Sequence, residues 1–281
     1  MPKILTPAQC DQYERDGFCG GIDVLDAAEV AHHRAGLETW EHRMGHALDF
    51  PEKSKSYLLF DWADAIVHHP RVLDAVEDVI GPDILVFHST MWIKEANTAA
   101  FVLWHQDGAH FHLDPAQHVT AWVALSEASV EAGCMHMIPG SHHGPWLQHE
   151  DKPSAHNMIR RGQGLPGYEG RQGTAVPLHA GQLSLHHTKT IHSSGPNNNA
   201  DRRIGYGISF IPTSVRPVGP AKPSALLVRG QDFHTHFHHE TRMAREMTPE
   251  AIAAHKLATD RFAAIQNAGF TTVAPAGFSK A

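Results

Sequence analysis

The feature that most constrains the fold of this chain is a change of character at residue 84. From there, short segments rich in strand-forming residues alternate with turns built from glycine, proline and asparagine, such as 138–141 and 194–199. The strand-like segments are 84–94, 119–125, 182–185 and 204–211. Several short strands joined by such turns predict a jelly-roll barrel.

Helical patterns lie on both sides of this region. Thr6 is a good N-cap before Pro7, and helices are expected over 7–16, from 26 to about 44, over about 72–80 and over about 249–268. The predicted fold class is therefore mainly β with flanking α-helices and a jelly-roll, cupin-like core. A single domain, 1–281, is expected, with a helical N-terminal part (about 5–81), the core (about 84–215) and a C-terminal helix (about 248–268). The glycine-rich segment 145–173 is interpreted as an insertion over the site.

Composition excludes several classes of partner. The formal net charge of -7 argues against general affinity for nucleic acid or for an anionic membrane. No apolar run reaches the length that a membrane-spanning helix needs. Three cysteines, Cys10, Cys19 and Cys134, have no metal-type spacing and are interpreted as reduced thiols of a cytoplasmic protein. A small-molecule substrate remains the expected partner, and the oligomeric state is not readable.

The segment 104–108 contains a His-x-Asp pair, His105 and Asp107. On a strand, positions i and i+2 point to the same side, so both side chains can bind one metal ion. A second histidine from a distant strand would complete a two-histidine, one-carboxylate face, which leaves positions open and suits ferrous iron that also binds a co-substrate and oxygen. The alternative is a histidine and an aspartate at a strand end, each bonded to water.

A second candidate region follows about eighty residues later. His192 lies between two turns, and Arg203 begins a strand in which Gly205 and Gly207 share its face. Glycine within a strand marks close approach by a ligand or a backbone. An arginine beside two such positions indicates a slot for a small carboxylate, which guanidinium binds through both oxygens. The alternative is a surface arginine paired with Asp201, and this interpretation is preferred for Arg202.

The strand-like segment 84–94 has two different faces. One face is apolar and comprises Leu85, Phe87, Met91 and Ile93; the other is mixed and comprises His88, Thr90, Trp92 and Lys94. Such a strand is expected to line a cavity. The mixed face indicates a small polar or anionic substrate, although Lys94 could equally contact a co-substrate.

Three separated motifs, at 105–107, 133–142 and 192–203, together resemble the phytanoyl-CoA dioxygenase family. The resemblance extends more loosely from about residue 5 to 239. It implies a double-stranded β-helix, Fe(II), and 2-oxoglutarate and oxygen as co-substrates.

The resemblance also implies roles for individual residues. It implies His105, Asp107 and His192 as iron ligands, with Arg203 holding the distal carboxylate of 2-oxoglutarate. It further implies co-substrate contacts by Ser194, Trp122 and Thr90. Ser193 departs from the family pattern, because glycine is frequent there.

Because chlorinating relatives lack the carboxylate, Asp107 implies hydroxylation of an unactivated C–H bond of a small metabolite, with release of succinate and CO2.

Three further points remain from the sequence. A non-redox metal-binding jelly-roll, such as an isomerase, a hydrolase or a binding module, is the alternative function, and Arg203 argues against it. The histidine-rich segment 234–239 is interpreted as solvated or as part of a lid rather than as a second metal site. One of His186 and His187 is expected to face inward.

Overall fold

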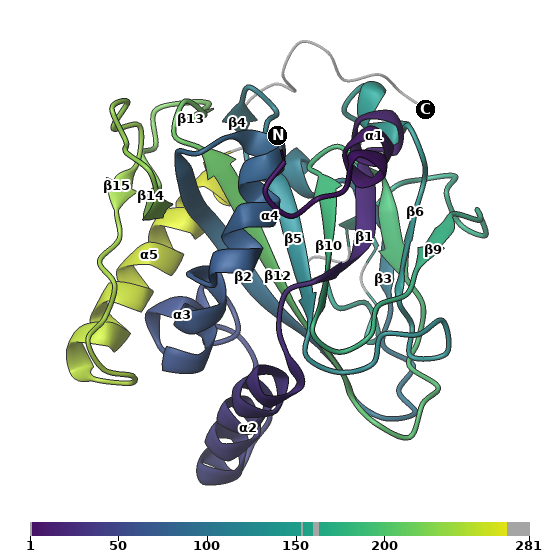
Figure 1. Ribbon diagram of the computed structural model, residues 1–281, viewed down its shortest axis with the longest axis horizontal. Helices are drawn as coiled ribbons and strands as arrows, with labels where there is room; N and C mark the ends of the chain where they lie inside the picture. The colour runs from purple at the N-terminus through teal and green to yellow at the C-terminus, as the bar shows by residue number, and fades with distance from the viewer. Residues whose placement is uncertain (1, 153, 160–162, 269–281) are drawn as a thin grey trace.

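The computed structural model of the chain describes residues 2–152, 154–159 and 163–268. Its α-helices, visible in Figure 1, are α1 (Pro7–Asp16), α2 (Ala27–Met44), α3 (Asp61–Val67), α4 (Pro70–Ile80) and α5 (Pro249–Ala268). Helix α1 begins where expected, because Thr6 and Gln9 form a capping box that satisfies free backbone N–H groups. Asp26 and Glu29 do the same for α2. Each of these two helices ends at a glycine in the left-handed conformation.

The strands form two main sheets, as the sequence predicts for a jelly-roll. The larger has the order β1 (Phe18–Asp23), β10 (Gln182–His187), β5 (Val119–Ala124), β12 (Arg203–Pro212), β2 (Ile84–Lys94), β14 (Ser224–Arg229) and β15 (His238–His239). The smaller has the order β3 (Val102–His105), β11 (His192–Ser194), β6 (Met135–Met137) and β9 (Thr174–Val176). Short two-stranded ribbons pair β4 (Leu113–Asp114) with β13 (Arg216–Pro217) and β7 (Glu150–Asp151) with β8 (Gln163–Gly164).

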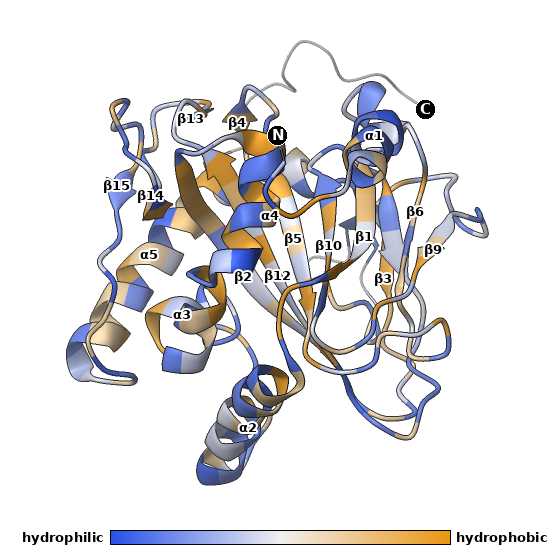
Figure 2. Cartoon of the chain, viewed as in Figure 1, coloured by the Kyte–Doolittle hydropathy of each residue, from blue (hydrophilic) through white to orange (hydrophobic). Residues whose placement is uncertain are grey.

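One face of the larger sheet packs against helices. Alternate residues of β12 belong to this core, as the sequence predicts: Ile204, Tyr206, Ile208 and Phe210. Residues of α3 and α4, such as Ile66 and Val76, join the same cluster, and Figure 2 shows the strongest hydrophobic colour along these central strands. The opposite face of the sheet is therefore free to look toward the smaller sheet, with Trp122 of β5 and Met135 and Met137 of β6 in a second cluster.

Strand β2 contains a bulge that changes which side chains share a face. In its pairing with β12, Ser209 lies opposite His88 and Phe210 opposite Val86, so Phe87 is the extra residue. The prediction of one apolar face is consequently wrong. Met91 lies in the main core, whereas Phe87 lies in another cluster together with α5. The bulge brings Phe87 and His88 to the side of the sheet that holds the site.

The predicted regions are confirmed in outline and corrected at their edges. The N-terminal part is not purely helical, because β1 pairs with β10 at the edge of the larger sheet. The sheet also extends beyond residue 215 through β14 and β15. None of the helices in the described part of the chain is long and apolar enough to span a membrane. The assignment of all 281 residues to one domain stays a prediction.

Candidate active site

Three predicted ligands converge between the two sheets. His105 ends β3 and His192 begins β11, and the two residues are register partners in the smaller sheet. The Nε2 atoms of His105 and His192 lie 3.3 Å and 3.6 Å from Oδ1 of Asp107. One donor atom from each of the three residues lies within 4.8 Å of the other two. Donors about 3 Å apart are expected around a single metal ion with bonds of about 2.1 Å, so the spacing fits one ion.

Both histidines are oriented by the backbone. Nδ1 of His105 lies 2.8 Å from the carbonyl oxygen of Leu103, and Nδ1 of His192 lies 2.9 Å from that of Thr190. Because a carbonyl only accepts, Nδ1 carries the proton in each ring and Nε2 presents a lone pair. Burial, helped by His105, lowers the pKa of His192 well below its ordinary value. Neutral imidazoles facing a carboxylate are the donor set that Fe(II) binds.

Asp107 is held in place by two more side chains. Its Oδ2 accepts hydrogen bonds from Oγ1 of Thr120, at 2.7 Å, and from Nε2 of His186, at 3.1 Å. Burial opposes ionisation of Asp107, but His192, His105 and His186 outweigh it and lower its pKa well below the usual range. The carboxylate is therefore ionised, with Oδ1 left for a metal. His186 is the inward-facing member of the expected pair and takes a hydrogen-bonding role.

His105 and Asp107 are not brought together by strand alternation, as the sequence analysis expected. Strand β3 ends at His105, and Asp107 begins a short 3-10 helix, Asp107–His110, so strand alternation does not align the pair. Gln106 between them fixes the turn instead. It is fully buried, and its side chain accepts from the backbone N–H of Leu147 and donates to the carbonyl oxygen of Lys189.

A small inner cavity of about 40 Å³ adjoins the triad His105, Asp107 and His192. Three of the predicted co-substrate contacts line it: Arg203, Ser194 and Trp122. The guanidinium carbon of Arg203 lies 5.1 Å from the Trp122 ring, a cation–π distance. The structure thus brings these three residues to the side of the triad where a small acid could bind.

Two buried basic side chains meet beside this cavity. Arg203 and Lys94 are register partners on β12 and β2, and each has an exposed fraction of at most 1%. Neither has a carboxylate partner among the described residues, and Nε of Arg203 has no hydrogen-bond partner there. Nζ of Lys94 donates to Oγ of Ser194 at 2.7 Å and to the carbonyl oxygen of Gly195. Burial, together with Arg203, lowers the pKa of Lys94 to about 6, and burial lowers that of Arg203 to about 10. An anion bound here would supply the missing counter-charge.

The two strand glycines have a different function from the one expected. A Cβ atom on Gly205 would lie 1.7 Å from Cζ2 of Trp122, and one on Gly207 would lie 3.0 Å from Nε1 of Trp92. The space above the glycines is therefore filled by indole rings rather than left open as a carboxylate slot. The close approach that the glycines predict is real, but the approaching groups are the walls of the cavity.

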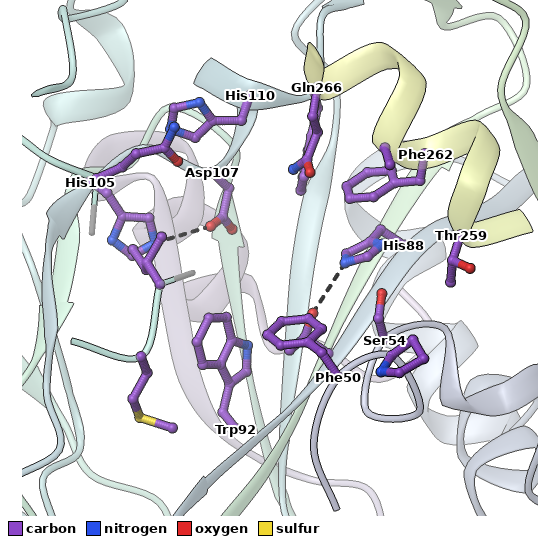
Figure 3. Close-up of a pocket in the computed structure, with 17 residues that line it drawn as sticks. Phe50, Ser54, His88, Trp92, His105, Asp107, His110, Thr259, Phe262 and Gln266 are labelled. Carbon is purple, nitrogen blue, oxygen red and sulfur yellow. Dashed lines mark hydrogen bonds and ion pairs between the residues drawn. The ribbon is translucent and has the colours of Figure 1, made fainter. Parts of the chain in front are cut away.

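A second, larger cavity of about 510 Å³ is lined by His105 and Asp107 of the triad (Figure 3). The two cavities share Trp92, His105 and Asp107, so the ligand atoms lie where they meet. Other walls of the larger cavity come from separate parts of the chain and include Phe50, His88, Phe111, Phe262 and Gln266. Its volume is typical of a site for a small organic molecule.

Thr90 is not placed with the other predicted co-substrate contacts. It lines the larger cavity, and its hydroxyl lies 3.1 Å from Nε2 of His88. Its role as a co-substrate contact stays a prediction. Sequence reasoning missed Thr120 and the contribution of α5, since nothing in the pattern of a C-terminal amphipathic helix indicates that Thr259 and Phe262 face a site.

The histidine-rich segment 234–239 provides no ligand cluster. Most of it is exposed, and His239 is paired with Asp232 at 2.7 Å. Within the described ranges, the triad is the one group of three or more potential ligands with metal-compatible spacing.

A jelly-roll core with a two-histidine, one-carboxylate triad between its sheets defines a mononuclear metal-binding protein of the non-haem oxygenase type. Residues 13–205 match the phytanoyl-CoA dioxygenase family. The chain belongs to this family, as its motifs indicate.

Solved relatives share the fold, and two of the similar proteins are alpha-ketoglutarate dependent or were solved with iron and alpha ketoglutarate. A solved non-haem monooxygenase, ThoJ, is 32% identical, with a TM-score of 0.81 over 92% of this chain and 98% of that one. The epimerase SnoN, solved with Fe3+, alpha ketoglutarate and nogalamycin RO, is 28% identical, with a TM-score of 0.61 over 76% of this chain and 87% of that one. A probable alpha-ketoglutarate-dependent hypophosphite dioxygenase of Stutzerimonas stutzeri is 30% identical over 53% of this chain and 54% of that protein.

The chain spans about half the length of the curated relatives it matches. The prediction of iron and 2-oxoglutarate as cofactor and co-substrate is confirmed at the level of the family by these relatives.

Proposed function

We propose that this protein is an Fe(II)- and 2-oxoglutarate-dependent dioxygenase that hydroxylates an unactivated C–H bond of a small metabolite. The observation that carries the proposal is the juxtaposition of an ionised Asp107, flanked by His105 and His192, with two buried basic side chains, Arg203 and Lys94, that have no carboxylate partner among the described residues. A non-redox metal site has no need of a second, acid-binding chamber, which disfavours the alternative of an isomerase, a hydrolase or a binding module.

In this proposal, the iron is held by Nε2 of His105, Nε2 of His192 and a carboxylate oxygen of Asp107. When bound, iron with 2-oxoglutarate and oxygen supplies C–H oxidation, so that substrate, 2-oxoglutarate and O2 give hydroxylated substrate, succinate and CO2. Arg203 binds the distal carboxylate of 2-oxoglutarate, and Lys94 and Ser194 add charge and a hydroxyl. Trp122 packs along the co-substrate and excludes water. The substrate then lies in the larger cavity, beyond the triad.

Hydroxylation rather than chlorination follows from Asp107. Its carboxylate fills the third protein-ligand position, and Thr120 and His186 keep it there. We further propose that the protein works in the cytoplasm, because Cys10, Cys19 and Cys134 are free thiols.

The test measures binding of 2-oxoglutarate under nitrogen to protein loaded with Fe(II), and then succinate release under air. Binding with succinate formation is expected for the native chain. The Asp107→Ala variant should bind iron poorly and yield no hydroxylated product. Absence of 2-oxoglutarate binding by the native, iron-loaded protein would refute the proposal, and unchanged activity of Asp107→Ala would remove Asp107 from the ligand set.

A further inference from the structure

Asp107 is supported by two neighbouring strands of the larger sheet. Its two donors, Thr120 of β5 and His186 of β10, are direct register partners, and both donate to Oδ2 of the carboxylate. Just beyond β10, the backbone carbonyl oxygen of Thr188 accepts from the N–H of Gly108 at 3.2 Å. The sheet therefore fixes both the side chain of Asp107 and the start of the 3-10 turn that carries it.

A further histidine extends this arrangement. His118 directly precedes β5, and its Nε2 atom lies 3.2 Å from Oγ1 of Thr120. The backbone carbonyl oxygen of His118 accepts from the N–H of Thr188 at 3.0 Å, so His118 lies at the end of the same two strands. Its side chain is buried, with 1% of the residue exposed. Because His118 is not among the described residues that line either cavity, it can act on the site only through another residue.

The chemistry of these groups fixes the direction of each hydrogen bond. The hydroxyl of Thr120 has one hydrogen, and an ionised carboxylate only accepts, so this hydrogen points to Oδ2 of Asp107. The oxygen of Thr120 must then accept from the ring of His118. Burial lowers the pKa of His118 to about 3, so the ring is neutral at pH 7 and its one proton is on Nε2. The chain of donors runs from His118 through Thr120 to Asp107.

A packing role alone does not explain a histidine at this position. The ring packs against Phe111 at a centroid distance of 5.0 Å, which an apolar side chain would also do. Nδ1 of His118 is buried and has no hydrogen-bond partner in the described ranges of the chain. A buried polar atom without a partner lowers stability, so an apolar residue would serve packing better. The N–H that His118 gives to Thr120 is what such a residue could not supply.

We propose, on the basis of the oxygenase function above, that His118 is a positioning residue of the iron site. Its N–H holds the hydroxyl of Thr120 in the orientation that donates to Asp107, and linked hydrogen bonds of this kind strengthen one another. Oδ1 of Asp107 is thereby kept facing Nε2 of His105 and of His192. Without this N–H the hydroxyl can rotate, the carboxylate is less well oriented, and iron binds more weakly.

Two variants of similar size separate the N–H from packing. His118→Gln keeps a donor at the position of Nε2, whereas His118→Met has the same length and no donor. In anaerobic titration, affinity for Fe(II) should fall about three- to ten-fold in His118→Met and stay within about two-fold of the native value in His118→Gln. The visible absorption of Co(II) bound in place of iron depends on the geometry of the ligands, and it should change in His118→Met alone.

The control is His33→Met, which replaces a buried histidine of α2 that also has an unpartnered Nδ1 among the described residues. His33 lies outside the described lining of both cavities, so this variant should bind Fe(II) like the native chain. A loss in His33→Met equal to that in His118→Met would overturn the inference.

A double-mutant cycle tests the order of action. If His118 acts on Asp107 through Thr120, His118→Met should not weaken binding of Fe(II) further once Thr120→Val is present. Additive losses would mean that His118 acts by another route, and would overturn the inference.

A measurement on the native chain does not depend on whether the variants fold. NMR of the protein loaded with Zn(II), which is diamagnetic, should show the proton of the His118 ring on Nε2, with the ring assigned through its own backbone. A proton on Nδ1 would overturn the inference, as would native affinity in His118→Met or equal losses in His118→Met and His118→Gln. Failure of the native chain to bind Fe(II) would instead refute the proposed function, and the inference with it.

Discussion

Arg203 is buried beside the triad without a carboxylate partner in the described part of the chain, while its neighbour Arg202 is ion-paired with Glu41 and Glu95. The expected pairing of Arg202 with Asp201 is wrong, because Asp201 is paired with Arg34. The variant Arg203→Met should weaken 2-oxoglutarate binding at least about ten-fold, because a charged hydrogen bond contributes about 1.5–3 kcal/mol. The free energy of unfolding without ligand should not fall, since an uncompensated buried cation is removed. Calorimetry and denaturant titration measure both quantities. The matched control Arg202→Met should keep the native affinity, and equal losses in the two variants would contradict the assignment.

Thr120 acts on the metal through Asp107. Replacing its hydroxyl in Thr120→Val leaves Oδ2 of Asp107 with one donor fewer, and the carboxylate becomes free to rotate. We expect affinity for Fe(II) to fall about 10- to 100-fold, as is typical when a residue that orients a ligand is lost. Anaerobic metal titration measures this directly. The control is Thr213→Val. Thr213 is buried and follows the C-terminal end of β12, whereas Arg203 begins that strand, so this variant should bind iron like the native chain.

At the scale of elements, the close fit of β12 to the indole of Trp122 makes Gly205 the least replaceable position of that strand. The methyl group of Gly205→Ala would lie 1.7 Å from Cζ2 of Trp122, so it would overlap with the indole ring. The cost should be about 1–3 kcal/mol or more, seen as a melting temperature lower by about 2–10 °C and a weaker site for 2-oxoglutarate. The added methyl group of Gly207→Ala would lie 3.0 Å from Trp92 and 3.5 Å from Trp122, and this substitution should cost less. If the two variants melt at the same temperature, Trp122 is not what requires the glycine.

The elements also separate what sequence can and cannot predict. Periodicity and caps suffice for α1, α2, α5 and the core-facing residues of β12, because these depend on local alternation and on capping chemistry. The bulge at Phe87 could not be anticipated, since it adds one residue to a ladder without any local signal. The three residues of the candidate triad, His105, Asp107 and His192, could be singled out from the sequence by their motifs and the family resemblance, and the structure brings them together. The support of Asp107 by Thr120 could not be anticipated, because it depends on how β5 packs behind the 3-10 turn.

For the whole molecule, ligand binding should be visible as thermal stability. Iron and 2-oxoglutarate bind the folded chain, and a ligand at a hundred times its dissociation constant adds about 2.7 kcal/mol. The melting temperature should therefore rise by about 5–10 °C with Fe(II) under nitrogen and fall again with a chelator. A further rise with 2-oxoglutarate should require the metal. Asp107→Ala should show neither shift, and a metal-independent shift with 2-oxoglutarate would indicate that Arg203 and Lys94 suffice to bind it.

Helix α5 closes one side of the larger cavity yet contributes no metal donor, and it lies outside residues 13–205, the stretch shared with the family. Part of the wall of the larger cavity is thus carried by a stretch of polypeptide that holds no residue of the triad. Exchanging the C-terminal helix between relatives should transplant preference for one compound over another while leaving the oxidising machinery intact. Substitutions within the roughly twenty residues of α5 could therefore change which compound such a protein prefers without altering its triad.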